Sequence, residues 1–287
     1  MNPYARIRTE VSAALDVCVT AATPVAGGCI SPSYRLACAD DTIIFVKAAP
    51  SSAPTGLLEQ EAASLRQIAQ TGTVRVPSVL AVTAAWLALE WLEPSRATNA
   101  GWEELGRSLA RLHRNRAPQF GREAANCIGA LRQSNDWSSD WPSFWRTQRL
   151  QPQVSLAAAR LGGAAVARFE RLYDGLDERL AAAGKDGPSL LHGDLWSGNV
   201  HFTDEGSALI DPSSYYGHRE VDLAMAALFG GFPGSFFAAY SSEWPLIAGA
   251  ESRRPVYQLY YLLVHVNLFG GGYVSQTLRM LDTAVAG

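Results

Sequence analysis

Apolar positions in the first third of the chain switch between helical spacing and strand-like runs. Pro77 separates the second helical segment from two further apolar runs, and the polar stretch 93–101 then interrupts the pattern. The pattern predicts a small sheet region that ends at residue 92. Its expected elements are helices at 11–19 and 57–71, and strands on both sides of the turn 26–32, at 42–47, 78–82 and 86–91.

After Trp102 the spacing becomes mostly helical. We expect a helix at 103–116 and one long helix over 162–183. Residues 255–278 carry no charged side chain at pH 7 if His265 is neutral, but they include polar residues and three consecutive glycines, so we expect a buried helix rather than a membrane span. The predicted fold is α+β with two lobes, residues 1–92 and 93–287, and a cleft between them.

The composition narrows the classes of function. Hydrophobic residues make up 48% of the 287 positions and charged residues 18%, which is enough for a sizeable core, and the net charge is −3. This balance disfavours nucleic acid and anionic membranes as partners. Charged residues interrupt the first 19 positions where an export signal would be apolar, and the four cysteines lack zinc or disulfide spacing. We therefore expect a cytoplasmic protein.

The strongest chemical pattern is the segment LLHGDLWSGNV at 190–200, followed by ALIDP at 208–212. Its His, Asp and Asn match the HxD…N spacing of a kinase catalytic loop. Phosphoryl transfer needs one carboxylate to accept a hydroxyl proton and oxygen ligands to hold magnesium against the phosphates. Asp194 suits the first role, and Asn199 with Asp211 the second. The alternative is that these residues only cap turns.

Residues upstream follow the order expected of a kinase. Gly27 and Gly28 form a loop whose backbone amides can approach an anion, although such a pair is more often only a hairpin turn. Lys47 lies near the end of an apolar strand, where an ammonium group needs a carboxylate or phosphate partner. Glu61 is the natural partner for Lys47, with a solvated helix face as the alternative reading of Glu61. No GxxxxGK[ST] motif is present.

Three segments carry a resemblance to a known family: HGDLWSGN, IDPSSYYGHREVDLAMAALFGGF and YQLYYLLVHVNLFGGGY. The sequence resembles the fructosamine (ketosamine) kinases, relatives of aminoglycoside phosphotransferases with a protein-kinase-like fold. The resemblance implies transfer of phosphate from ATP, with Mg²⁺, to the third-carbon hydroxyl of a free or protein-bound ketosamine. The product would then eliminate phosphate and free the amine, a deglycation. Fructosamine and ribulosamine both remain open as the sugar.

The same resemblance suggests further roles. Backbone groups of Glu90 and Leu92 would contact adenine, and Trp196 and His265 would contact the substrate, with ordinary packing as the alternative for the last two. Other expectations are these: Tyr215, His218 and Arg219 as weaker pocket candidates, Asp222 and His192 as braces of the catalytic loop, His113 as a core residue, Glu220 as a cap or site residue, and Cys29 as an oxidisable thiol or an inert turn residue.

Two other functions stay open at this point. The first is a kinase of an aminoglycoside or another small hydroxylated molecule, which would be expected to have an acidic pocket without the Trp196 platform. The second is a nucleotide-binding pseudokinase, which intact Lys47, Asp194, Asn199 and Asp211 argue against. The sequence gives no signal for the oligomeric state.

Overall fold

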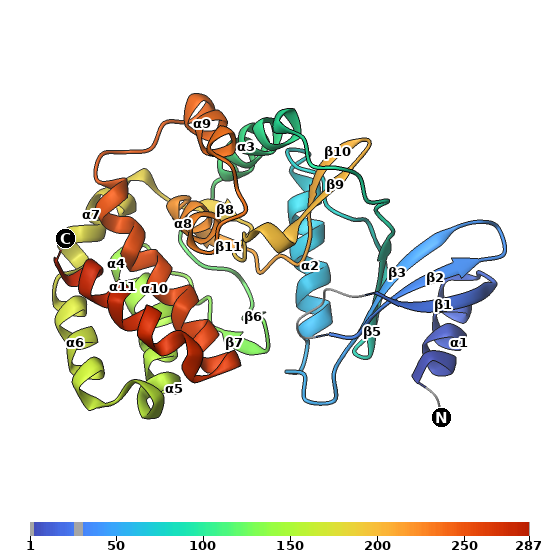
Figure 1. Cartoon of the computed structure of the whole chain (residues 1–287), viewed down its shortest axis with the longest axis horizontal. Coiled ribbons are helices and arrows are strands. Elements are labelled where there is room, and N and C mark those ends of the chain that lie inside the picture. The colour runs from blue at the N-terminus through green and yellow to red at the C-terminus, as the bar shows by residue number, and fades with distance from the viewer. Residues whose placement is uncertain (1–2, 26–30, 287) are drawn as a thin grey trace.

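The computed structural model describes residues 3–25 and 31–286; Gly27, Gly28 and Cys29 lie outside these ranges. The N-terminal part is built on a five-stranded antiparallel sheet with the order β1-β2-β3-β5-β4 (Figure 1). The strands are β1 (Val19–Val25), β2 (Ser33–Cys38), β3 (Ile43–Ala48), β4 (Val79–Val82) and β5 (Trp86–Glu90).

Successive side chains of a strand point to opposite faces of a sheet, and here the two faces pack against different helices. Trp86 and Ala88 of β5 join the core of helix α1 (Pro3–Leu15), while Leu87 and Leu89 join that of helix α2 (Leu57–Gln70). Lys47 of β3 lies opposite Leu87 in the ladder. Its side chain is therefore on the face covered by α2.

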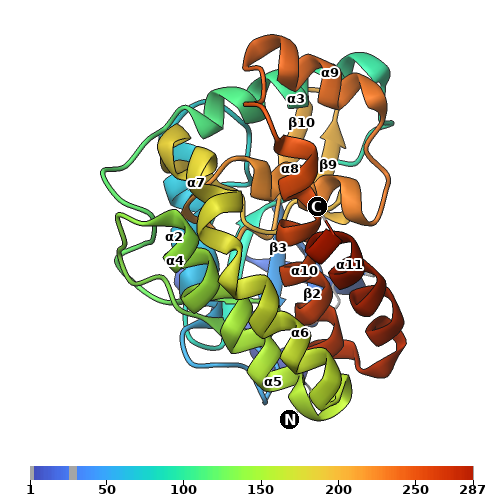
Figure 2. The ribbon, with the colours of Figure 1, turned by 90° about the vertical axis from the view of Figure 1, so that its left-hand side faces the viewer.

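The C-terminal part is largely helical, and its main core is formed by side chains from the helices between residues 141 and 286 (Figure 2). In Figure 1 these helices lie at the opposite end of the molecule from α1, with α2 between them and the sheet. The helices are α3 (Asn99–His113), α4 (Trp141–Phe144), η1 (Trp145–Leu150), α5 (Gln151–Leu161), α6 (Gly163–Asp174), α7 (Leu176–Asp186), α8 (Glu220–Leu228), α9 (Gly234–Glu243), α10 (Ala250–Phe269), η3 (Gly271–Tyr273) and α11 (Val274–Ala286).

Three short two-stranded sheets connect the parts of the chain that carry chemistry. Strands β8 (Ser189–Leu191) and β11 (Tyr215–Gly217) pair on either side of the segment with the kinase pattern, and β9 (Val200–Thr203) pairs with β10 (Gly206–Leu209) inside it. The third pair is the hairpin of β6 (Asn126–Ile128) and β7 (Leu131–Gln133).

Three sequence predictions are corrected. The first helix covers Pro3–Leu15, and the chain is already a strand at Val19. The expected long helix over 162–183 is two helices, α6 and α7, because Gly175 leaves the helical conformation between them. The uncharged stretch is divided at Gly270 between α10 and α11, and no helix in the described part of the chain is long and apolar enough to cross a membrane.

Candidate active site

Lys47 lies at the centre of a group of three charged side chains. Its Nζ donates to Glu61 Oε1 at 2.8 Å and to Asp211 Oδ1 at 2.5 Å. The pairing of Lys47 with Glu61 is the one predicted from the sequence; the contact with Asp211 was not predicted. Burial alone would lower the pKa of Lys47, but the charges of Asp211 and Glu61 outweigh this effect and raise it. Lys47 therefore stays cationic and is fixed at the point where the sheet meets the loop of Asp211.

Asp194 follows strand β8 in a loop that hydrogen bonds hold in place. Asn199, on the single turn η2 (Ser197–Asn199), donates from Nδ2 to the Asp194 carbonyl at 2.8 Å and to Oδ2 of its side chain at 3.3 Å. Burial raises the pKa of Asp194 to about 7, and the negative charge of Asp211 adds to the shift. A carboxylate with this pKa can accept a proton at neutral pH.

The loop is braced from the helical side by Asp222 of α8. Its two carboxylate oxygens accept from the backbone amides of His192 at 2.7 Å and Gly193 at 2.9 Å. Burial would raise the pKa of Asp222, but hydrogen bonding with His113 and the loop amides lowers it, so Asp222 stays ionised. His113 is fully buried and also contacts Tyr240. The expected bracing position of Asp222 and core position of His113 are both observed.

His192 joins the two loops of the site. Its Nε2 donates to the Ile210 carbonyl at 2.9 Å, and its Nδ1 accepts from the Asp194 amide. Since Ile210 precedes Asp211, His192 links the segment of Asp194 to that of Asp211. Burial lowers the pKa of this imidazole, so it is neutral and acts as a spacer between the loops.

The side chains of Asn199 and Asp211 suit a magnesium ion. Both hydrogen bonds of the Asn199 side chain use Nδ2, which leaves Oδ1 available as a ligand. The Asp211 side chain is 36% exposed, and its backbone has the left-handed φ of 57° that aspartate tolerates better than most residues. Magnesium is held in kinases by one or two carboxylate or amide oxygens together with phosphate oxygens, so the donor set fits.

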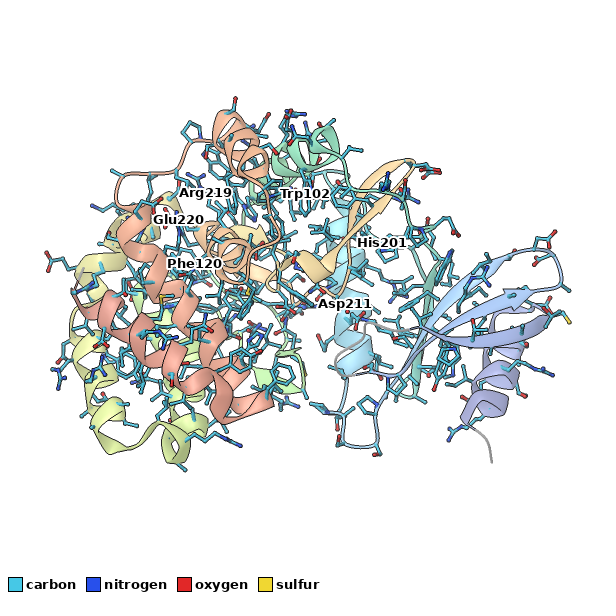
Figure 3. All side chains as sticks on the ribbon, viewed as in Figure 1. Trp102, Phe120, His201, Asp211, Arg219 and Glu220 are labelled. Atoms are coloured by element: carbon cyan, nitrogen blue, oxygen red, sulfur yellow. The ribbon has the colours of Figure 1, made fainter. Side chains whose placement is uncertain are left out.

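These groups open into one cleft of about 480 Å³. In Figure 3, Asp211 lies where the helical part of the molecule faces the sheet. Trp196 lines the cleft beside Asp194, and its ring lies over Gly198: a β-carbon at position 198 would be 2.1 Å from Trp196 Cη2. The glycine is therefore required for the ring to take this position. The predicted site residues that line the cleft are Lys47, Glu61, Glu90, Leu92, Asp194, Trp196, Asn199 and Asp211.

Glu90 and Leu92 line the cleft but already use some of the groups assigned to a purine. The Glu90 amide donates to the Ser78 carbonyl at 2.9 Å, and its side chain binds Arg75. The Leu92 carbonyl accepts from His201 Nε2 at 2.9 Å. Within the described residues no partner is found for the Leu92 amide, which is therefore the backbone donor left to meet a base.

His265 lies outside this cleft lining. Its Nδ1 donates to the Tyr261 carbonyl one turn earlier on α10, at 2.8 Å, and its ring contacts Phe229, Phe269 and Tyr273. The need for a hydrogen-bond partner is thus met within the helix, and substrate contact by His265 stays a prediction.

Three weaker pocket candidates belong to the interior instead. Tyr215 packs under the Arg149 guanidinium, while His218 and Arg219 both contact Asp186. All three are at most 1% exposed and none lines the cleft, so this prediction was wrong. Glu220 is neither a cap nor a cleft residue, because it forms a two-point ion pair with Arg253. Figure 3 shows Arg219 and Glu220 well to the helical side of Asp211.

Sequence reasoning missed the β6–β7 hairpin, although Asn126, Cys127 and Gly129 all line the cleft. Gln133 donates to Ser213 Oγ, and Ser213 Oγ donates to the Cys127 carbonyl, so the hairpin is attached to the loop after Asp211. The strands are only three residues long, too short for a period-2 pattern to stand out.

The fold and the cleft define a phosphotransferase of the protein-kinase-like class. The streptomycin–ATP complex of APH(2")-IIa matches with a TM-score of 0.67 at 14% identity, and the choline kinase LicA of Streptococcus pneumoniae with 0.66 at 16%, each covering at least 98% of both chains. At such identities the likeness concerns the fold alone.

The chain belongs to the fructosamine kinase family, whose model matches residues 4–286. It is 40% identical to the "Probable ketoamine kinase" of Enterococcus faecium (90% of this chain, 93% of that one), 36% to the "Ketosamine-3-kinase" of Mus musculus (89% and 92%), and 37% to the chloroplastic "Protein-ribulosamine 3-kinase" of Arabidopsis thaliana (92% and 82%). The crystal structure assigned to a fructosamine-3-kinase of Thermobifida fusca matches with a TM-score of 0.90 at 35% identity, over 98% of this chain and 99% of that chain. The resemblance seen in the sequence is confirmed, and the protein is a kinase.

Proposed function

We propose that the protein transfers the γ-phosphoryl group of ATP to the third-carbon hydroxyl of a ketosamine, either a ribulosamine or a fructosamine. The observation that supports this most directly is the convergence of Lys47, Asp194, Asn199 and Asp211 on one cleft that also contains the Trp196 ring. The names of the relatives support the choice of acceptor. Release of phosphate from the product would then free the amine.

In this proposal Asp194 accepts the proton of the acceptor hydroxyl as its oxygen bonds to the γ-phosphorus. The bond to the bridging oxygen breaks at the same time, and ADP leaves with that electron pair. Lys47, held by Glu61, stabilises the negative charge that develops on the phosphate oxygens. Magnesium, bound by Asn199 and Asp211, would supply further neutralisation of that charge.

The two ends of the cleft would bind different substrates. We assign the nucleotide to the side formed by residues 1–92, where Gly27, Gly28, Lys47, Glu90 and the Leu92 amide would contact it. The side formed by residues 93–287 would bind the acceptor. There Trp196 offers a flat apolar face to a sugar and an indole N–H as a donor. His265 remains a candidate for contact with the acceptor.

The test is phosphoryl transfer from ATP with magnesium to ribuloselysine, fructoselysine and kanamycin, with the Asp194→Asn protein as the blank. Turnover of either ketosamine with an inactive blank is the expected result, and the ratio of the two ranks the sugars. Turnover of kanamycin alone would move the protein to the aminoglycoside kinases. ATP binding without turnover of any acceptor would favour the pseudokinase.

A further inference from the structure

Helix α2 carries Glu61, and two kinds of contact hold it in place: apolar packing against the sheet, and hydrogen bonds to segments outside the sheet. The apolar residues Leu58, Ala62 and Leu65 are buried in the core that α2 shares with the sheet. Beyond Glu61 the helix also presents two polar side chains, Ser64 and Gln67, one and two turns further along. Both are hydrogen-bonded to residues from outside the N-terminal sheet.

Arg122 supplies the first of these contacts. It lies just before β6, and its Nη1 donates to Ser64 Oγ at 2.8 Å and to the Ser214 carbonyl at 3.1 Å. The backbone around it is fixed, because the Gly121 amide donates to Tyr216 and the Arg122 amide to Asn135, both at carbonyl oxygens. One guanidinium nitrogen therefore joins α2 to the segment that follows Asp211.

The contacts of the Arg122 guanidinium are with neutral groups. Within residues 3–25 and 31–286 it forms no ion pair, and burial lowers the pKa of its guanidinium. Partial burial of an arginine side chain costs free energy unless hydrogen bonds or an opposite charge compensate for the lost hydration. Here its contacts are two neutral oxygens on two different segments, which is the arrangement of a connector rather than of a surface charge.

Ser214 supplies the second contact between α2 and the segment that follows Asp211. Its hydroxyl donates to Gln67 Oε1 at 2.9 Å, and Ser214 is fully buried. Three residues earlier, Asp211 accepts a hydrogen bond from Lys47 Nζ, which also donates to Glu61. The helix of Glu61 and the segment of Asp211 are thus joined twice: at Lys47, and again through Arg122 and Ser214.

We infer that Arg122 is a positioning residue for phosphoryl transfer: it holds α2 against the segment after Asp211, so that Glu61 and Asp211 both reach Lys47. Arg122 does not itself line the cleft, and it acts through Glu61. This inference rests on the nucleotide-binding role of Lys47 in the proposed function. Beyond that role, the contacts of Arg122 with Ser64 and Ser214 hold α2 in the position needed for catalysis.

The experiment measures the ATP Kd by calorimetry, with magnesium and without acceptor, together with kcat. Arg122→Gln is made in the wild type and in Glu61→Gln, and exposed Arg171→Gln on α6 is the matched control. In the wild type we expect Arg122→Gln to raise the ATP Kd about fivefold and to lower kcat about tenfold. In Glu61→Gln we expect a further change of less than about twofold, because residues that act through one another are not additive.

Equal effects of Arg122→Gln in both backgrounds, or no effect in the wild type, would overturn the inference and leave Arg122 as a packing residue. If Arg122→Gln does not fold, Ser64→Ala removes the same hydrogen bond without altering charge. Because Ser64 also lines the cleft, only its non-additivity with Glu61→Gln supports the inference, and equal losses in both backgrounds would overturn it. A wild-type protein that binds ATP but phosphorylates no ketosamine would refute the proposed acceptor while the coupling remains measurable. A wild type that does not bind ATP would overturn both.

Discussion

Two groups of charged side chains in this molecule differ in their access to solvent. In the cleft, Lys47 meets Glu61 and Asp211, and the Asp211 side chain is 36% exposed. Among the C-terminal helices, Arg253 meets Glu220 through two hydrogen bonds of 2.8 and 2.6 Å, and both side chains are at most 5% exposed. The first group is open to the cleft on one side, and the second is almost completely buried.

The difference indicates what each group does. Arg253 and Glu220 are almost completely buried, and losing one partner leaves an unpaired buried charge, so we expect this pair to contribute to stability. Lys47 has a partner at the cleft surface, because the partly exposed Asp211 carboxylate lines the cleft, where a bound phosphate would be within reach of the same ammonium group. Changes in the cleft should therefore alter rate, and changes among the helices should alter stability.

The largest expected effect is that of Asp194→Asn, which should lower kcat by about 10³-fold, because a positioned general base contributes this order of magnitude. Stabilisation of the variant by ATP, measured as a shift in Tm, should persist. Exposed Asp177→Asn on α7 is the control. Full activity of Asp194→Asn would refute the assignment of Asp194 as the base.

Among the helices, Arg253→Met should lower the free energy of unfolding by about 3–5 kcal/mol, since Glu220 remains buried without its partner. Its neighbour Arg254 pairs with Glu251 at the surface, and Arg254→Met should cost less than about 1 kcal/mol. Urea unfolding measures both. If Arg253→Met instead lowers kcat per folded molecule and leaves the urea midpoint unchanged, the contrast between the two groups fails.

Lys47→Ala should lower kcat by about 10²-fold, a typical loss for one preorganised positive group that faces the developing charge. The free energy of unfolding should change much less than in Arg253→Met, because the remaining carboxylates are close to the cleft and can be hydrated or protonated. The chain's only other lysine, exposed Lys185, gives the matched control Lys185→Ala. Equal losses of stability in Lys47→Ala and Arg253→Met would contradict this comparison.

The pH dependence follows from the raised pKa of Asp194, about 7 in the folded protein. Only the ionised form accepts a proton, so kcat/KM should fall about tenfold per pH unit below that value. In the unfolded chain the pKa is near 3.9, so the folded state binds the extra proton between about pH 4 and 7 and wild-type stability falls as pH rises through that window. Asp194→Asn has no such loss, so its Tm should rise relative to that of the wild type between about pH 4 and 7 and change little relative to it above pH 7. A flat activity profile from pH 6 to 8 would contradict the assignment.

The smallest effect is expected for Gly198→Ala. Its β-carbon would lie within 2.1–2.5 Å of three Trp196 ring atoms, so the ring must move. If the ring contacts the sugar, KM for the ketosamine should rise about threefold while KM for ATP is unchanged, because only binding of the acceptor is disturbed. A rise in KM for ATP alone, with KM for the ketosamine unchanged, would place Trp196 outside the acceptor site.

The parts of the site that the sequence predicted are those carried by short segments. Asp194 and Asn199 lie five positions apart in one loop, and the strand position of Lys47 followed from an apolar run with a single charge. The contact of Asp211 with Lys47 joins residues 164 positions apart, and no local pattern reports it. The same holds for Arg122, whose partners Ser64 and Ser214 come from two distant segments.

The fold shows the same limit. The apolar run of β5 and the helical spacing along α2 predicted those elements closely, because both faces of β5 and one face of α2 are buried. The break at Gly175 was missed because apolar spacing continues across it. Tyr215, His218 and Arg219 were misplaced because polar residues close to a catalytic loop in sequence can be paired in the interior, as His218 and Arg219 are with Asp186.

Gly193 occupies the position at which protein kinases carry the arginine of their catalytic loop. In those enzymes a phosphorylated activation loop is ordered by pairing with arginine side chains. Here residue 193 has a φ of 85°, and a β-carbon would lie 2.0 Å from the Ser213 carbonyl oxygen, so there is no room for any side chain. The loop cannot carry an arginine that senses phosphorylation at this position, and activity controlled by such a signal would require both loops to be rebuilt together.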